Sequence, residues 1–171
     1  MLIVTTIFCF GLQASGQEKG YLAAGSGLPE LINFGVSYQL EQIQRGLYIG
    51  SFPRKSDGEA VRTFSGDVLY HFGGSSELSN RRPWYWKVGL DYLRNASVSK
   101  YIGYSVNHTF FLNTRIGRDF NHTNEIGIFI DIGPLFCLSE KYVTKHDVDR
   151  GCEYSVSPGI GTGLFVRILG N

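Results

Sequence analysis

The sequence contains no run of the roughly 18 apolar residues that a membrane-spanning helix needs, since its longest uncharged apolar stretch covers only residues 2–12. An excess of charge of one sign is also absent, because 16 Lys and Arg balance 15 Asp and Glu for a net charge of +1. Nucleic acid is bound by basic surfaces, so this balance predicts no nucleic-acid partner. Charged residues make up only 18% of the chain, below the usual quarter, which argues against a Lys- and Glu-rich helical protein.

Aromatic residues and glycine are abundant instead, with 12 Phe, 10 Tyr, 2 Trp and 22 Gly. This composition argues against intrinsic disorder. No stretch keeps a helical period long enough to cover a sheet, and at most one helical turn is expected, near residues 29–32. The length of 171 residues suits one domain with its own core. We therefore expect a single all-β domain without a linker or an internal repeat.

Residues 1–16 have the pattern of a secretory signal peptide. The apolar stretch is followed by Ala14 and Gly16, which are small residues at the two key positions of a cleavage site before Gln17. No Lys or Arg directly follows Met1, and the alternative interpretation of this segment is a buried first strand. Export predicts a signal peptide at residues 1–16 and a folded domain at residues 17–171.

The main signal along the chain is an alternation of apolar and other side chains with a period of two, which is typical of strands with two different faces. It is clearest where Ile126, Ile128, Ile130 and Ile132 alternate with other residue types. The alternation and the intervening turn signals predict eight strands, at residues 21–28, 33–40, 46–52, 62–72, 84–93, 102–117, 125–139 and 154–169.

Alternation alone fits two kinds of barrel. In a soluble sandwich or a lipocalin-like barrel the apolar face forms the core, whereas in a transmembrane barrel it faces lipid and the lumen is polar. The two longest predicted strands, at residues 102–117 and 125–139, have about 15 residues each, and soluble strands have mostly 5–6. A strand that crosses a bilayer needs about 9–11 residues, so their length favours the transmembrane alternative.

Aromatic residues on the apolar face favour the same alternative. With a periplasmic N-terminus and strands that alternate in direction, they gather toward two rims, as membrane-interface girdles do. One rim is predicted to hold Tyr70, Phe72, Trp84 and Trp86, and the other Phe64, Tyr92, Tyr104, Phe136 and Tyr154. The sequence thus predicts an eight-stranded antiparallel up-and-down transmembrane β-barrel with a polar lumen.

The opposite face of the strands collects nearly balanced charges among many Gly, Ser and Asn residues. We expect it to form a polar network in the lumen, made of Asp67, His71, Lys87, Asp91, Arg115, Glu125, Asp131 and Arg167. An eight-stranded barrel is just wide enough for its own side chains to fill it. The main interpretation is therefore a salt-bridged plug, with Arg115 roughly opposite Glu125 across a turn. The alternative is a narrow ion path.

Two further sets of residues are candidates for chemistry. Cys137 and Cys152 remain after export, and antiparallel pairing brings them near each other, so they either form a disulfide in an oxidising compartment or are two unrelated small residues. His108 lies on the apolar face at mid-strand, which suggests a lipid-directed esterase only faintly, because its neighbours Val106 and Phe110 are apolar. No metal-ligand spacing, phosphate loop or nucleophile elbow is present. We therefore expect no catalytic residue, metal site or cofactor.

The whole pattern resembles the small eight-stranded outer-membrane barrels of Gram-negative bacteria, the OmpA/OmpX-type class. The stretches at residues 82–85 (RPWY) and 115–120 (RIGRDF) are similar to those of an uncharacterised exported barrel family of that kind. The resemblance implies location in the bacterial outer membrane, contact with outer-membrane lipid, and the barrel-assembly machinery as a partner during biogenesis. Residues 163–168 keep the glycine and apolar alternation of the signal that this machinery reads, although the chain ends on Leu169, Gly170 and Asn171 rather than on an aromatic residue.

These observations predict a monomeric outer-membrane protein with a structural or surface-interaction role. Its outer loops, at residues 27–30, 53–60, 95–100 and 140–153, are expected to meet an unknown extracellular ligand or protein, while short turns lie at residues 41–44 and 118–124. The alternatives are a narrow pore or small-solute transport protein, a lipid-modifying esterase, and a soluble lipocalin-like ligand-binding barrel.

Overall fold

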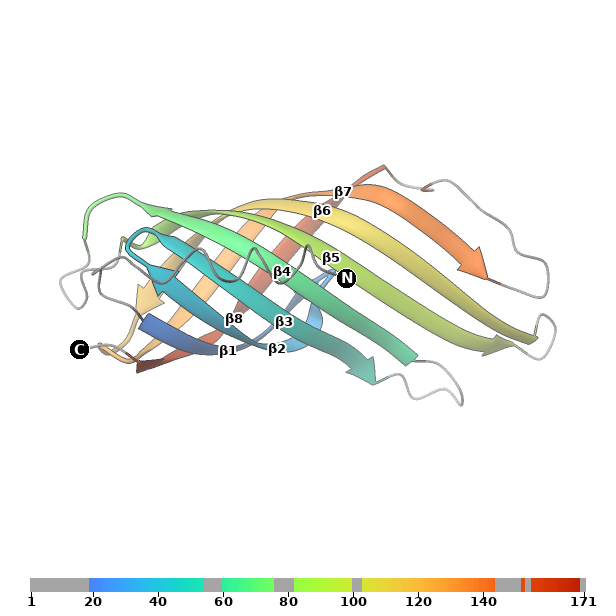
Figure 1. Cartoon of the computed structure of the whole chain (residues 1–171), viewed down its shortest axis with the longest axis horizontal. Helices are drawn as coiled ribbons and strands as arrows, with labels where there is room; N and C mark the ends of the chain where they lie inside the picture. The colour runs from blue at the N-terminus through green and yellow to red at the C-terminus, as the bar shows by residue number, and fades with distance from the viewer. Residues whose placement is uncertain are drawn as a thin grey trace, which may run out of the picture.

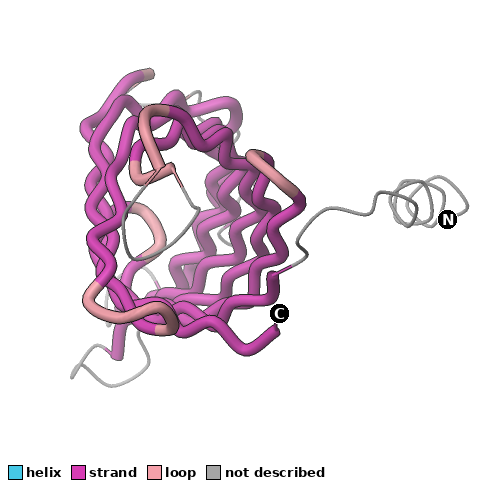
Figure 2. Tube along the Cα trace, turned by 90° about the vertical axis from the view of Figure 1, so that its left-hand side faces the viewer, coloured by secondary structure: helices cyan, strands magenta, loops and turns pink. Residues whose placement is uncertain are grey.

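The computed structural model describes residues 19–53, 60–75, 82–99, 103–143, 152 and 155–169. They form eight strands: β1 (Lys19–Leu28), β2 (Leu31–Leu40), β3 (Ile43–Pro53), β4 (Ala60–Phe72), β5 (Trp84–Ser99), β6 (Gly103–Asn121), β7 (Ile126–Val143) and β8 (Val156–Leu169). Each strand pairs antiparallel with the next, and β8 pairs with β1, so the sheet closes into a barrel (Figures 1 and 2). The predicted eight-stranded antiparallel barrel is confirmed. The predicted signal peptide and Tyr154 lie outside the described residues.

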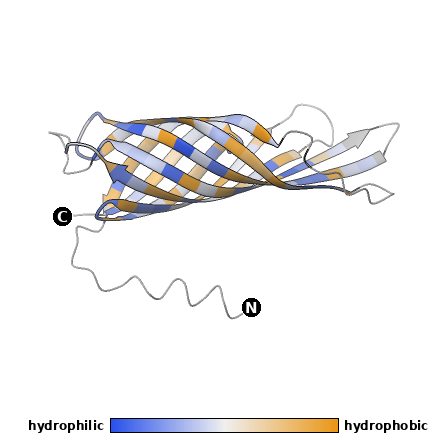
Figure 3. Cartoon of the chain, turned by 90° about the horizontal axis from the view of Figure 1, so that it is seen from above, coloured by the Kyte–Doolittle hydropathy of each residue, from blue (hydrophilic) through white to orange (hydrophobic). Residues whose placement is uncertain are grey.

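Side chains alternate between the lumen and the outer surface along each strand, which Figure 3 shows as alternating colours along the wall. On β7, the outward residues Ile126, Ile128, Ile130 and Ile132 are 43–59% exposed, whereas Asp131 between them is 2% exposed. A soluble barrel buries its apolar side chains, so this inverted pattern is that of a barrel surrounded by lipid. Among the described residues, no helix is long and apolar enough to cross a membrane.

The strands differ in length, and the long ones project from one end of the barrel (Figure 1). β1 and β2 have 10 residues each, whereas β5, β6 and β7 have 16, 19 and 18. We call the projecting parts of β5 (residues 94–99), β6 (103–109) and β7 (139–143) the projecting sheet.

Polar side chains join the strands of the projecting sheet. The Oγ atoms of Ser97 and Ser105 lie 2.8 Å apart, and Asn107 Nδ2 donates a hydrogen bond to Glu140 Oε1 at 2.5 Å. These contacts extend the pairing beyond the apolar wall. The predicted starts of two outer loops, at residues 95 and 140, are therefore wrong, since β5 continues to Ser99 and β7 to Val143. Residues 118–121 likewise belong to β6 rather than to a turn.

The connection between β1 and β2 is a two-residue turn that folds into the end of the barrel. Pro29 and Glu30 are both buried, and Leu31 begins β2 directly, with a φ of 61°. The expected helical turn near residues 29–32 is therefore not formed. Gly50 on β3 leaves room for the turn, because a Cβ at this position would lie 1.9 Å from the Glu30 carbonyl oxygen. We call Pro29 and Glu30 the plug turn.

Aromatic side chains lie on the outward face near the end of the barrel opposite the plug turn. Tyr70 is in register with Trp86, and Phe72 with Trp84. The rings of Phe72 and Trp86 stack with centroids 6.4 Å apart. This arrangement gathers the four residues predicted for this rim in two neighbouring strands.

A second aromatic group lies on the outward face toward the projecting sheet. Phe64 stacks on Tyr92 with centroids 6.4 Å apart, and Tyr92 contacts Phe110 at 4.9 Å. Phe136 on β7 is exposed two register pairs nearer the middle of the wall than Phe110, opposite Leu112. Tyr104, in contrast, lies near the start of β6 and well beyond Phe110, within the projecting sheet. Its predicted place at this rim is therefore wrong, because the strands continue past the rim.

Candidate functional site

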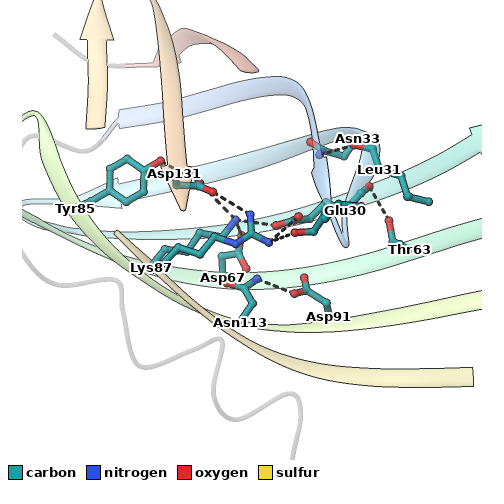
Figure 4. A network of polar contacts seen from close by, with 12 residues as sticks. Glu30, Leu31, Asn33, Thr63, Asp67, Tyr85, Lys87, Asp91, Asn113 and Asp131 are labelled. Carbon is teal, nitrogen blue, oxygen red and sulfur yellow. Dashed lines mark hydrogen bonds and ion pairs between the residues drawn. The ribbon is translucent and has the colours of Figure 1, made fainter. Parts of the chain in front are cut away.

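A network of buried charged side chains fills the lumen next to the plug turn (Figure 4). Arg115 on β6 has a side chain that is 0% exposed. Its Nη2 lies 2.8 Å from Glu30 Oε2, and its Nη1 lies 2.9 Å from Asp131 Oδ1. Arg115 Nη2 also donates a hydrogen bond to the Leu28 carbonyl oxygen at 2.6 Å. One guanidinium therefore joins β6 to β7 and, across the lumen, to the end of β1.

Lys87 on β5 is the second cation of the network. Its Nζ lies 2.9 Å from Asp67 Oδ2, 3.0 Å from Glu30 Oε1 and 3.9 Å from Asp131 Oδ2. Tyr85 adds a hydrogen bond from its hydroxyl to Asp131 Oδ2 at 3.1 Å. A buried charge is costly unless it is paired and hydrogen-bonded, and here each cation meets more than one carboxylate.

Asp91 is held by an amide instead of a cation. Asn113 Nδ2 donates a hydrogen bond to Asp91 Oδ2 at 2.7 Å, and both side chains are buried. The network as a whole holds more carboxylates than cations, with Glu30, Asp67, Asp91 and Asp131 against Lys87 and Arg115. This excess of acidic groups in a low-dielectric lumen disfavours the entry of anions.

His71 and Arg167 face the lumen outside the group of ion pairs, although the His71 ring contacts that of Tyr85 with centroids 5.5 Å apart. The ring nitrogens of His71 lie 3.0 Å from Gln44 Oε1 and 3.2 Å from the Arg82 carbonyl oxygen. Arg167 on β8 donates a hydrogen bond from Nη2 to Asn121 Oδ1 at 2.7 Å. Both residues therefore lie near the rim opposite the plug turn, where they form hydrogen bonds to residues in or next to the connections between strands.

Glu125 does not belong to the lumen, and its prediction as a partner of Arg115 is wrong. It is exposed in the bend at residues 122–125, and β7 begins only at Ile126. The β6–β7 register places Ile116 opposite Ile132. Arg115 therefore meets Asp131, which also faces the lumen, rather than a residue of the turn.

Glu30 is the charged residue of the network that is not predicted from the sequence, and Tyr85 and Asn113 are uncharged ones. The sequence pattern predicts an outer loop for Glu30, because the period of two describes strands and gives no direction for a side chain in a turn. The shortness of the connection was the available signal. An acidic residue in a two-residue turn cannot extend far from the barrel end, and here it points inward to Lys87 and Arg115.

Cys137 at the base of the projecting sheet and Cys152 are joined by a disulfide, with Cα atoms 6.1 Å apart. The two residues are separated by 15 positions. A cross-link over a loop of this length stabilises the folded chain by about 3 kcal/mol in the chain-entropy description.

The disulfide predicts a specific labelling result. In denatured protein that begins at Gln17, the two cysteines are expected to resist a thiol reagent before reduction and to react fully after it. Mass spectrometry of the labelled chain measures both states. Two labelled cysteines before reduction would contradict the bond, and a Cys137→Ser, Cys152→Ser variant provides the unlabelled control.

Other chemistry has little support in the described part of the chain. A cavity of 40 Å³ borders the charged network, which leaves room for only a few water molecules. No group of three or more His, Cys, Asp or Glu residues that suits a metal ion occurs among the described residues. His108 Nδ1 lies 2.5 Å from the Tyr92 hydroxyl, and no described hydrogen bond joins His108 to a serine or a carboxylate.

Comparison with solved structures finds two bacterial proteins whose fold is similar to this barrel. The N-terminal β-barrel domain of Pseudomonas aeruginosa OprF is similar with a TM-score of 0.58 at 14% identity, covering 90% of this chain and 98% of that one. Neisserial surface protein A (NspA) gives 0.52 at 12% identity, covering 89% and 95%. No family model and no curated protein sequence matches the chain. The resemblance in fold to the small eight-stranded barrels is confirmed.

Proposed function

We propose that this chain is an outer-membrane barrel that is closed to solutes and acts at the cell surface through its projecting sheet. The observation that carries the proposal is the position of the plug turn. Glu30 binds Lys87 and Arg115 inside the barrel at the same end from which β5, β6 and β7 project (Figure 1). The molecule thus closes its lumen and extends its wall at one end.

The paired charges support a closed lumen. Moving an ion past Arg115 and Lys87 requires the separation of several buried ion pairs, which is costly because the freed charges stay in a low-dielectric interior. The cavity beside the network, at 40 Å³, is itself too small to serve as a wide aqueous path. A narrow pore is therefore the weaker alternative for this chain.

The projecting sheet supports a role at the surface. Its inward-facing side carries polar side chains, namely Ser97, Ser105, Asn107, Thr109 and Glu140. Hydroxyl, amide and carboxylate groups can bind polar partners through hydrogen bonds. The disulfide between Cys137 and Cys152 fixes the base of the connection between β7 and β8. The partner class is an extracellular ligand or protein.

The outer membrane is the proposed location. An apolar outward face with aromatic residues toward both rims suits a bilayer, and the signal-peptide pattern at residues 1–16 supports export. Migration on a gel tests the barrel, because a folded barrel shifts its band on boiling. We expect the unboiled protein in the outer-membrane fraction to show this shift, and a soluble protein without a shift would refute the location.

Planar-bilayer recording tests the closed lumen. We expect the purified barrel, inserted in its folded form, to give no stepwise current. The reason is that ion pairs with Glu30, Asp67 and Asp131 hold Arg115 and Lys87 in the lumen. Insertion is verified on the same preparation by the gel shift and by protease protection of the wall. Regular openings in the wild type would refute the closed barrel and favour transport.

Surface labelling tests which end of the barrel faces outward. Tyr104→Cys in the projecting sheet, in a background with Ser at both native disulfide positions, is expected to react with an impermeant thiol reagent on intact cells. Tyr104 is 56% exposed near the end of the β5–β6 hairpin. The control is His122→Cys in the exposed β6–β7 connection, which is expected to react only after permeabilisation. The reverse order of labelling would refute the orientation.

A further inference from the structure

Basic side chains form one continuous row across the outward face of four neighbouring strands. Arg62 on β4 is the register partner of Arg94 on β5, Arg94 is the partner of His108 on β6, and His108 is the partner of Lys141 on β7. Arg62 and Lys141 are exposed, while Arg94 and His108 are half-buried. We call these four residues the basic row.

A β-bulge completes the basic row. The β6–β7 register shifts between Phe110 and Phe111, so that Phe110 pairs with Ser139 but Phe111 pairs with Cys137. From Ile126 up to this shift, the even-numbered residues of β7 point outward. After it, toward Val143, the odd-numbered Ser139 and Lys141 point outward instead. Bulges re-aim side chains in this way. Without the shift, Lys141 would point to the inward side and the row would end at β6.

An aromatic row lies directly beside the basic row, toward the middle of the wall. Phe64, Tyr92 and Phe110 are register partners on β4, β5 and β6. Next on the same face follow Leu90 and Leu112, which are also partners, and Leu90 is 59% exposed. The order along the wall is thus aliphatic, aromatic, basic. This is the order of the hydrocarbon, the interface and the headgroup layer of a bilayer.

The row lacks a compensating negative charge within the described part of the chain. No described salt bridge involves Arg62, Arg94 or Lys141, and the hydrogen-bond partner of Arg94 is the Tyr104 hydroxyl at 3.1 Å. Like charges directly opposite each other destabilise a strand pair. The direct pairing of Arg62 with Arg94 therefore costs free energy unless an anion lies against them.

The outward surface is also hollowed at one end of the row. This open hollow is lined by six residues, namely Tyr92, His108, Phe110, Ser139, Lys141 and Val143. Its lining combines cationic and hydroxyl groups with two aromatic rings. Such a lining suits a ligand with a negatively charged group at one end and an apolar group at the other.

We propose that the basic row binds the phosphate group of an anionic lipid in the leaflet around this rim. The phosphate lies against Arg62, Arg94 and Lys141, and the acyl chains lie on the aromatic row and the aliphatic wall beside it. Charge complementarity identifies the occupant, because a headgroup phosphate is the anion that the bilayer itself presents at this height. The site differs from the inward side of the projecting sheet and goes beyond the proposed function.

The opposite rim supplies a matched control. Arg45 and Arg118 also point outward there and are exposed. Arg45 pairs with Tyr38 and Val68, and Arg118 pairs with Trp84 and Ile130. Neither has a basic register partner, so the two carry charge at a rim without forming a row.

Native mass spectrometry tests the proposal on the purified barrel in a neutral detergent. The probes are phosphatidylglycerol and phosphatidylcholine, added at equal concentrations. We expect the wild type to retain phosphatidylglycerol preferentially, and an R62Q, R94Q, K141Q variant to lose this preference by about tenfold, since each basic residue near an anionic surface adds to the attraction. The R45Q, R118Q control is expected to change this preference by less than about twofold, because Arg45 and Arg118 have no basic register partner with which to bind one phosphate. An unchanged preference in the triple variant would overturn the proposal.

Two further measurements identify the ligand and check the fold. Inorganic phosphate at the same concentration is expected to leave the bound lipid in place, and full displacement by phosphate would overturn the assignment to a lipid.

In phosphatidylcholine nanodiscs we expect the triple variant to unfold at a temperature no lower than that of the wild type, because the repulsion within the row is removed. Addition of phosphatidylglycerol should then stabilise only the wild type. Equal stabilisation of both proteins would contradict the site, whereas a conducting wild type would refute only the closed barrel.

Discussion

Arg115→Ala is expected to lower the free energy of unfolding by about 3–5 kcal/mol, the usual cost of removing one partner from a buried ion pair. The substitution leaves Glu30 and Asp131 facing each other with only Lys87 to balance them. It also removes the hydrogen bond to the Leu28 carbonyl oxygen. Urea unfolding of the barrel in lipid vesicles, followed by tryptophan fluorescence and by the gel shift, measures the change.

Two variants separate the role of Arg115 from the general effect of losing an arginine. Arg118→Ala removes an outward guanidinium that lies 5.1 Å from the Trp84 ring centroid, and we expect a change below about 1 kcal/mol for such an exposed contact. Arg115→Lys keeps the charge but cannot bind two carboxylates and a carbonyl in the same planar geometry, so its effect should be intermediate. An Arg115→Ala variant as stable as the wild type would show that the network does not hold the barrel end.

Gly50→Val is expected to destabilise the barrel by about 3 kcal/mol, because it combines overpacking with the loss of buried contacts. A Cβ at this position would lie 1.9 Å from the Glu30 carbonyl oxygen and 2.3 Å from Thr63 Oγ1. The plug turn must therefore move, and the hydrogen bond from Thr63 Oγ1 to the Glu30 carbonyl oxygen, 2.9 Å long, must break. Urea unfolding measures the loss of stability.

A matched glycine shows whether the effect of Gly50→Val comes from the plug turn. A Cβ on Gly66 would meet only Leu47 Cδ2, at 3.5 Å, among the atoms around it. Gly66→Val is therefore expected to change the unfolding free energy by less than about 1 kcal/mol, because it adds a β-branched side chain to a strand without a clash. Equal stability losses in the two variants would contradict a plug turn packed over Gly50.

The strand pattern and the lumenal face could be predicted because both follow from a period of two. Asp67, Lys87, Asp91, Arg115 and Asp131 face inward for the same reason that the isoleucines of β7 face outward. Antiparallel neighbours with short connections also leave few alternative orders for the strands. The fold and the direction of most charged residues are thus local properties that recur along the chain.

The parts that could not be predicted depend on single events that interrupt the period. The inward direction of Glu30 follows from a two-residue turn and the space above Gly50. The outward direction of Lys141 follows from one bulge in the β6–β7 pairing. Glu125 is predicted to face the lumen but lies in the bend before β7, which begins one residue later than predicted. Each of these events concerns one turn, one bulge or one strand end, so the errors fall on individual residues while the fold remains correct.

The contacts of Arg115 also act on the seam at which the barrel closes. The hydrogen bonds of its guanidinium to Leu28 and Glu30 span 87 and 85 positions of the sequence. Contacts between such distant residues form late in folding, because the chain must first lose the entropy of closing a long loop. Since β1 must also pair with β8, any lateral separation of β1 from β8 that moves β1 away from β6 would break these bonds. The bonds of Arg115 across the lumen therefore resist the separation of β1 from β8 and the lateral opening of the wall.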